Sequence, residues 1–222
     1  MTESEKALFH PRFSHMTKQY VHSFHFGCKV TKHQLSSIIN SDFFAFPSKT
    51  LIQDKRQILV IGNPPWVTNS TLSALGSDNL PLKTNFKGLK GMDAITGASN
   101  FDICEYIILQ LIHEYRDSNT VIAMLCKTSV ARNVFMELKR NGISFSACDI
   151  LEFDAAKVFG ITASACVLVV VLSENAVSPE ICNVYDFENP EVIQSKFGYK
   201  NGQFCNNLGV DAEDFDGQCC FE

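Results

Sequence analysis

The chain has 222 residues, of which 45% are hydrophobic and 19% charged, so it can bury the core of one globular domain and is not a disordered tail. Its formal net charge of −5 argues against a protein that holds DNA unaided, because such proteins present a basic face to the phosphates. No apolar stretch approaches the roughly 18–20 residues of a membrane span; the polar start is no secretory signal and the nine cysteines form no CxxC pair, which predicts a soluble, cytoplasmic protein without a membrane partner.

The first predicted elements are a helix and two strand segments. Thr31 and Gln34 form a capping box that predicts a helix start, and an apolar piece at residues 42–44 predicts a strand end. Residues 57–62 are a continuous apolar run, which predicts a strand covered on both faces. The composition of residues 67–99 then shifts to Asn, Ser, Thr, Gly and Lys, which predicts an inserted loop of the substrate-binding kind.

The second half of the chain alternates helix and strand patterns. Apolar spacing predicts a helix over residues 101–115, and residues 129–140 form a further predicted helix that Asn141-Gly142 ends. Strands are predicted over the apolar runs 121–126, 143–151 and 166–172. This alternation predicts an α/β protein with a doubly wound, mainly parallel sheet and helices on both faces.

The most informative motif is Asn63-Pro64-Pro65-Trp66, directly after the strand at 57–62. Ligands of open α/β sheets bind beyond the carboxyl ends of the strands, where this motif falls. The Asn63 side-chain oxygen and the Pro64 carbonyl are two acceptors for the hydrogens of a planar amine such as adenine N6, and the prolines at 64 and 65 make them rigid. Trp66 offers a flat face for an extruded base. The alternative is a plain turn followed by a core tryptophan.

These four residues resemble the catalytic signature of the N6-adenine DNA methyltransferases of restriction-modification systems. The resemblance continues at Asp42 and Phe43, similar to the acidic motif that binds the adenine part of S-adenosylmethionine, and at Asn100, in a motif that lines the cofactor and target pockets. Phe159 resembles the late aromatic that stacks on the flipped adenine opposite the catalytic aromatic. The alternatives are an ordinary strand-end carboxylate for Asp42 and a core aromatic for Phe159.

The resemblance implies a Rossmann-like, S-adenosylmethionine-dependent methyltransferase fold with a mainly parallel sheet, an antiparallel strand near residues 166–172 and an incomplete N-terminal side. Residues 1–30 lack the glycine-rich cofactor loop of the family. Residues 31–187 are the expected catalytic core with the inserted loop 67–99, and residues 188–222 a C-terminal extension towards a missing region. The rest of the polypeptide is therefore an expected partner.

The expected substrate is double-stranded DNA with a flipped adenine. Lys83, Lys87 and Lys90 in the inserted loop are candidates for phosphate contacts, the alternative being a solvated loop. The six histidines form no HxH or HExxH pattern, so no metal is expected. Two other functions stay open: methylation of an RNA base or of a protein glutamine amide, and a remnant that is catalytically incomplete.

Overall fold

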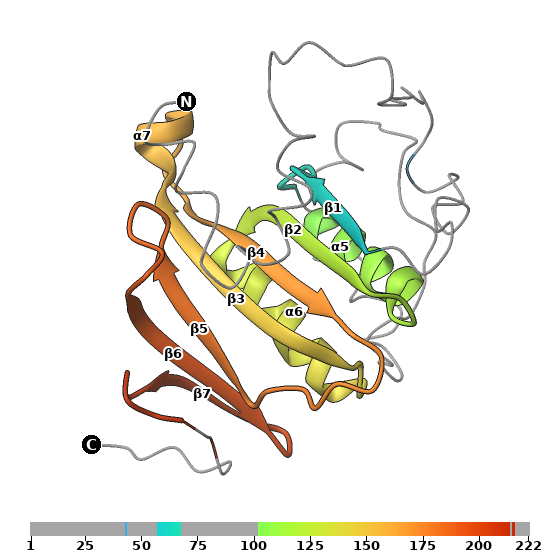
Figure 1. Ribbon diagram of the computed structural model, residues 1–222. Helices are drawn as coiled ribbons and strands as arrows, with labels where there is room; N and C mark the ends of the chain where they lie inside the picture. Colours follow the sequence, from blue (N-terminus) through green and yellow to red (C-terminus); the bar gives the residue numbers. More distant parts are fainter. Residues whose placement is uncertain (1–42, 44–56, 68–101, 214, 216–222) are drawn as a thin grey trace, which may run out of the picture.

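The computed structural model describes residue 43, residues 57–67, residues 102–213 and residue 215 (Figure 1). The elements in chain order are β1 (Ile58–Gly62), α5 (Ile103–Tyr115), β2 (Thr120–Lys127), α6 (Thr128–Arg140), β3 (Phe145–Asp154), α7 (Ala155–Phe159), β4 (Ser164–Leu172), β5 (Ile181–Asp186), β6 (Ile193–Lys200) and β7 (Gln203–Leu208). The helix start predicted at Thr31, the loop over residues 67–99 and most of the strand end at 42–44 lie outside the described residues.

Six predicted elements are confirmed to within three residues at each end: β1, α5, β2, α6, β3 and β4. The predicted end of α6 is also confirmed, because Asn141 is its C-cap and Gly142 has a φ of +61°, in the left-handed region that favours glycine. Four elements were not predicted: the five-residue helix α7 and the strands β5, β6 and β7. None of the described helices is long and apolar enough to cross a membrane.

The seven described strands form one mixed sheet in the order β1-β2-β4-β3-β5-β6-β7. The predicted antiparallel strand is confirmed, because β4 runs antiparallel to both β2 and β3. The predicted majority of parallel pairs is not found in the described part of the sheet, where only β1–β2 and β3–β5 are parallel. The reason is local connection: β5, β6 and β7 follow one another through short links, which join neighbouring strands only when these are antiparallel.

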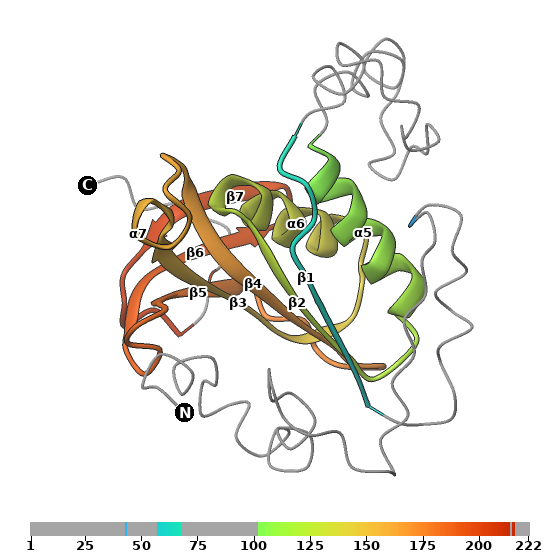
Figure 2. The ribbon, with the colours of Figure 1, turned by 90° about the horizontal axis from the view of Figure 1, so that it is seen from above.

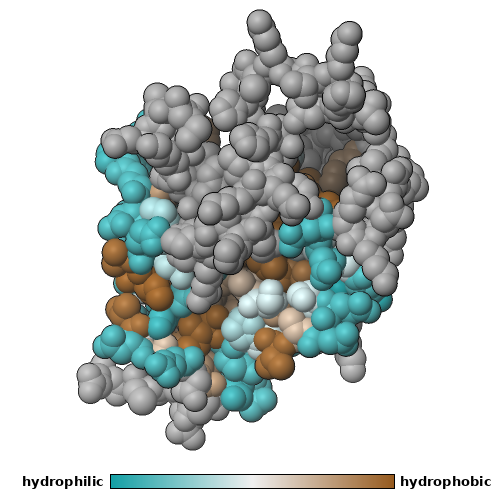
Figure 3. All heavy atoms as spheres, in the orientation of Figure 1, coloured by the Kyte–Doolittle hydropathy of each residue, from teal (hydrophilic) through white to brown (hydrophobic). Residues whose placement is uncertain are grey.

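Helices α5 and α6 lie on the same face of the sheet (Figure 2). They pack on alternate residues of β2, namely Ile122, Met124 and Cys126, and together these form the main core. Helices on both faces, as expected for a doubly wound fold, are therefore not found among the described elements. The opposite face carries a smaller cluster around Val121 and Leu151, and Figure 3 shows apolar side chains among polar ones on that side.

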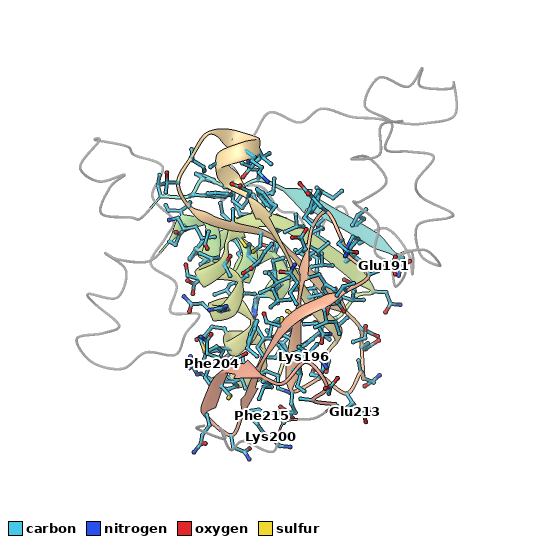
Figure 4. The ribbon with its side chains drawn as sticks, turned by 90° about the vertical axis from the view of Figure 1, so that its left-hand side faces the viewer. Glu191, Lys196, Lys200, Phe204, Glu213 and Phe215 are labelled. Atoms are coloured by element: carbon cyan, nitrogen blue, oxygen red, sulfur yellow. The ribbon has the colours of Figure 1, made fainter. Side chains whose placement is uncertain are left out.

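Strand β1 is an edge strand among those described, and Ile61 is 59% exposed, so the predicted burial on both faces is wrong for this residue. Near the other edge of the sheet, residues after β7 pack tightly against β6. A Cβ atom on Gly198 would lie 2.6 Å from the Phe215 ring, and the Lys196 ammonium donates to the Ala212 carbonyl at 2.6 Å (Figure 4). The boundary predicted after residue 187 falls between β5 and β6, which are paired neighbours.

Candidate active site

The candidate site lies at the end of the sheet where three strands, β1, β2 and β3, have their carboxyl ends. This end is called the carboxyl edge. Strand β1 is parallel to β2, and both β2 and β3 are antiparallel to the strand between them, β4. The segment after β1, the start of α6 after β2, helix α7 after β3 and the start of β4 therefore share this edge (Figure 1). This is the position at which open α/β sheets bind ligands.

A cavity of about 250 Å³ brings the predicted catalytic motif together with the predicted stacking residue. It is lined by Asn63, Pro64, Pro65, Trp66, Phe159 and Ile161. Pro64 is buried and holds the turn, whereas Asn63 is exposed. Residues almost a hundred positions apart in sequence thus form one concave surface.

The Trp66 and Phe159 rings touch edge to face rather than lying parallel. Their centroids are 6.4 Å apart and their planes are inclined by 89°. Phe159 also contacts Phe153, at 5.9 Å between centroids. A flat ligand held between Trp66 and Phe159 therefore requires one of the rings to turn.

Trp66 is fixed in place by a hydrogen bond and by packing against the core. Its indole nitrogen donates to the Leu125 carbonyl of β2 at 3.3 Å, and its ring packs against the main core. The next residue, Val67, accepts a hydrogen bond from the Ile103 amide at the start of α5, at 2.9 Å. Trp66 is thus half-buried, and it both packs against the core and lines the cavity.

An ion pair that the sequence did not predict joins α5 to β2 beside this turn. Asp102 is the N-cap of α5: one carboxylate oxygen accepts from the Cys104 amide at 2.9 Å, and the other from the Lys127 ammonium at 2.9 Å. The Asp102 side chain is 13% exposed. Asp102 follows Asn100 in the motif already noted, and its place before an apolar helix is the signal that predicts a cap.

These two contacts of Asp102 can be separated by substitution. Asp102→Ala removes the cap and the ion pair, and we expect it to lower the free energy of unfolding by about 1–2 kcal/mol. Asp102→Asn keeps a good cap and should cost less than half as much. Urea denaturation measures both variants. Asp117→Asn is the control, because its ion pair with Arg116 is exposed and should contribute nothing measurable. Equal losses for Asn and Ala at position 102 would show that charge, not capping, dominates.

Comparison with known proteins identifies a relative: type II methyltransferase M.NspV from Nostoc sp.. The two sequences are 34% identical over 174 residues. The chain is related to a type II methyltransferase. The match covers 75% of this chain and 35% of that methyltransferase, so the chain spans about a third of its relative's length. It confirms the resemblance to restriction-modification methyltransferases that the sequence predicted. No family model and no solved structure matches the chain.

Of the other site residues predicted in this chain, the structure describes only Phe43. Asp42, Asn100 and the three loop lysines, Lys83, Lys87 and Lys90, lie outside the described residues. Phe43 is described: it is half-buried and packs against the main core, and it is not among the residues that line the cavity.

The thiols near the site are buried and neutral. A hydrogen bond with the Cys126 thiol, together with burial, raises the pKa of Cys104 far above its ordinary value. Its thiol is therefore protonated and does not act as a nucleophile. Among the described residues, no group of three or more His, Cys, Asp or Glu side chains could hold a metal ion.

Proposed function

We propose that the chain carries the catalytic core of a site-specific DNA adenine-N6 methyltransferase of a restriction-modification system, working in the cytoplasm with S-adenosylmethionine as methyl donor. The observation that carries the proposal is the cavity in which Asn63, Pro64, Pro65 and Trp66 meet Phe159, at the carboxyl edge of the sheet in a relative of a type II methyltransferase. Phe159 is 46% exposed, unlike the aromatic residues of the core, so its ring is accessible to a ligand.

The chemistry follows from the electronic state of the target. The N6 lone pair of adenine is delocalised into the ring, so the amine is a poor nucleophile until its hydrogens are drawn out of the ring plane. The Asn63 amide oxygen and the Pro64 carbonyl accept one hydrogen each and favour tetrahedral nitrogen. Because Pro64 is buried and both prolines have fixed φ, the Pro64 carbonyl needs little reorganisation.

The residues that line the cavity fit this reaction because all six are uncharged. S-adenosylmethionine, when bound, supplies a methyl group on a positively charged sulfonium, which leaves as a neutral thioether. An uncharged, aromatic surface tolerates that cation and a neutral base at the same time. Asp42, Phe43, Asn63 and Asn100 are the residues proposed to hold the cofactor, and no metal is required.

Substrate binding is proposed to use both aromatic residues and the loop lysines. A base extruded from the duplex stacks on Trp66, and Phe159 turns from its edge-to-face contact to cover the other side. Lys83, Lys87 and Lys90 are proposed to contact the phosphates beside the extruded nucleotide.

Two alternatives share the motif and make different predictions. Methylation of an RNA base or of a glutamine amide uses the same planar nitrogen, but the type II methyltransferase relative favours DNA. A catalytically incomplete remnant would keep the fold without binding cofactor; residues 1–30 contain no glycine-rich cofactor loop.

The test measures methylated nucleosides directly. The chain is incubated with S-adenosylmethionine and unmethylated genomic DNA, and in parallel with RNA and with a protein extract, and each product is digested and analysed by mass spectrometry. We expect N6-methyladenine in DNA above the level of a reaction without enzyme. Methyl groups in RNA or protein alone would contradict the proposal. A folded chain that shows no heat of binding with S-adenosylhomocysteine would support the remnant.

A further inference from the structure

A second and larger cavity adjoins the first. Its volume is about 380 Å³, and Ile161 lines both cavities. It lies at the carboxyl ends of β2 and β3, between Thr128 at the start of α6, Phe153 in β3 and Ser164 at the start of β4. The two cavities therefore form neighbouring compartments of the same edge of the sheet.

One wall of this second cavity holds an unsatisfied hydrogen-bonding group. The Thr128 hydroxyl is buried, with the residue 5% exposed, and it has no hydrogen-bond partner. Burying a hydroxyl without a partner costs free energy, so such groups are rare without a function. Thr128 is also the first residue of α6, whose N-cap, Lys127, forms no side-chain cap. The Thr128 hydroxyl is therefore an unused donor behind this wall, and a turn of its side chain would present it to a ligand.

The opposite side of the cavity differs in chemistry. Glu152 and Asp154 line it, and their carboxylates disfavour an anion such as phosphate. Asp154 is occupied as the N-cap of α7, where it accepts from the Ala156 and Lys157 amides at 3.0 and 3.2 Å. Glu152 can accept a hydrogen bond from a ligand, and Phe153, whose ring contacts Phe159 and Phe187, is the aromatic residue of the lining. A ligand that fits Thr128, Glu152 and Phe153 together is uncharged and planar, with hydrogen-bond acceptors on one edge and a donor on another.

We propose that this second cavity binds a nucleobase of the DNA, that of the nucleotide next to the flipped adenine. The inference rests on the proposed function, in which the first cavity binds the flipped adenine. Because Ile161 lines both cavities, they are suitably placed for consecutive nucleotides. Glu152 accepts from an exocyclic amine, in the way that acidic side chains read cytosine N4, and the Thr128 hydroxyl donates to a ring nitrogen or carbonyl oxygen. The cavity is thus a site for sequence discrimination beside the chemical step.

Substitution of Thr128 gives an unusual combination of effects. Thr128→Val keeps the shape and removes the unsatisfied hydroxyl, so we expect Tm to rise by about 2–4 °C while base binding weakens about fivefold. Thr120→Val is the matched control at the other end of β2. The Thr120 hydroxyl is buried too but bonds to the Ser118 hydroxyl at 2.8 Å, so its loss should lower Tm without affecting base binding.

The binding experiment uses photo-crosslinking of the full 222-residue chain. The probe is single-stranded DNA of mixed sequence with 5-iododeoxyuridine at varied positions, and crosslinked peptides are mapped by mass spectrometry. We expect crosslinks at Phe153 as well as at Trp66 or Phe159, and a roughly fivefold loss at Phe153 alone in Thr128→Val. Crosslinks at Phe153 that Thr128→Val leaves unchanged, their absence from the wild type, or their suppression by millimolar inorganic phosphate would each overturn the inference.

The same samples separate this inference from the proposed function. Methyl transfer to DNA without crosslinks at Phe153 would overturn the second base site and leave the methyltransferase proposal standing. Crosslinks at Phe153 that depend on Thr128, in a chain that transfers no methyl group to any substrate, would support the base site and contradict the proposed function.

Discussion

Asn63→Ala is expected to reduce methyl transfer to DNA by about 10²- to 10³-fold, the loss typical of removing one preorganised group that acts in the transition state. Asn63 is exposed at the mouth of the cavity, so its truncation leaves the core intact. Initial rates of N6-methyladenine formation measure the effect. Calorimetric titration with S-adenosylhomocysteine should show a much smaller loss of affinity than of rate, because Asn63 shares the cofactor with Asp42, Phe43 and Asn100 but is the residue whose amide oxygen acts on the target amine.

The matched control for this substitution is Asn206→Ala. Asn206 is an exposed asparagine on β7, at the opposite end of the strand order from β1. We expect its removal to change neither the rate nor the affinity. If Asn63→Ala instead lowered cofactor affinity and rate by the same factor, the side chain would be structural or part of the cofactor site.

Phe159→Ala is expected to lower kcat/KM by about 5- to 150-fold, which corresponds to a loss of about 1–3 kcal/mol of stacking on one base. Stability should change little, because the ring is nearly half exposed. Phe159→Tyr keeps the aromatic face and should retain most of the activity. Trp66 is the single tryptophan and lies 6.4 Å from Phe159, so its fluorescence reports binding of DNA at the cavity directly.

Val158→Ala is the control for this prediction. Val158 is 60% exposed on the same short helix but does not line the cavity, so its truncation should not affect transfer. A large fall in Tm for Phe159→Ala, with unchanged kcat/KM, would instead assign Phe159 to packing against Phe153.

The sequence predicted those parts of the fold in which local pattern and tertiary packing agree. Helices α5 and α6 have a helical apolar spacing, and the buried strands β2 and β4 are continuous apolar runs. Their positions therefore follow from the local pattern of apolar residues. Helix α7 is only five residues long, too short for periodicity, and its existence depends on the Asp154 cap and on Gly160 at a φ of +68°. The strands β5, β6 and β7 were not predicted, and their antiparallel pairing through short links explains why the described part of the sheet has no parallel majority.

The sequence likewise predicted some features of the candidate site and not others. The Asn63–Trp66 motif follows a strand and could be placed from the sequence, and the resemblance indicated Phe159. The angle between the Trp66 and Phe159 rings could not be foreseen, because it depends on how α7 places a side chain at the edge of the sheet. The Asp102–Lys127 pair and the unsatisfied Thr128 hydroxyl likewise depend on neighbours from other elements.

The position of β4 between β2 and β3 has a consequence for synthesis of the protein. This strand pairs with β2 along Thr120–Lys127 and with β3 along nearly its whole length, yet it is made after both. Until residue 172 has left the ribosome, β2 and β3 each expose an unpaired apolar edge that invites association with other chains. Phe159 and Ile161 lie in the connection between β3 and β4, so we expect the cavity beside Trp66 to form only after β4 has paired.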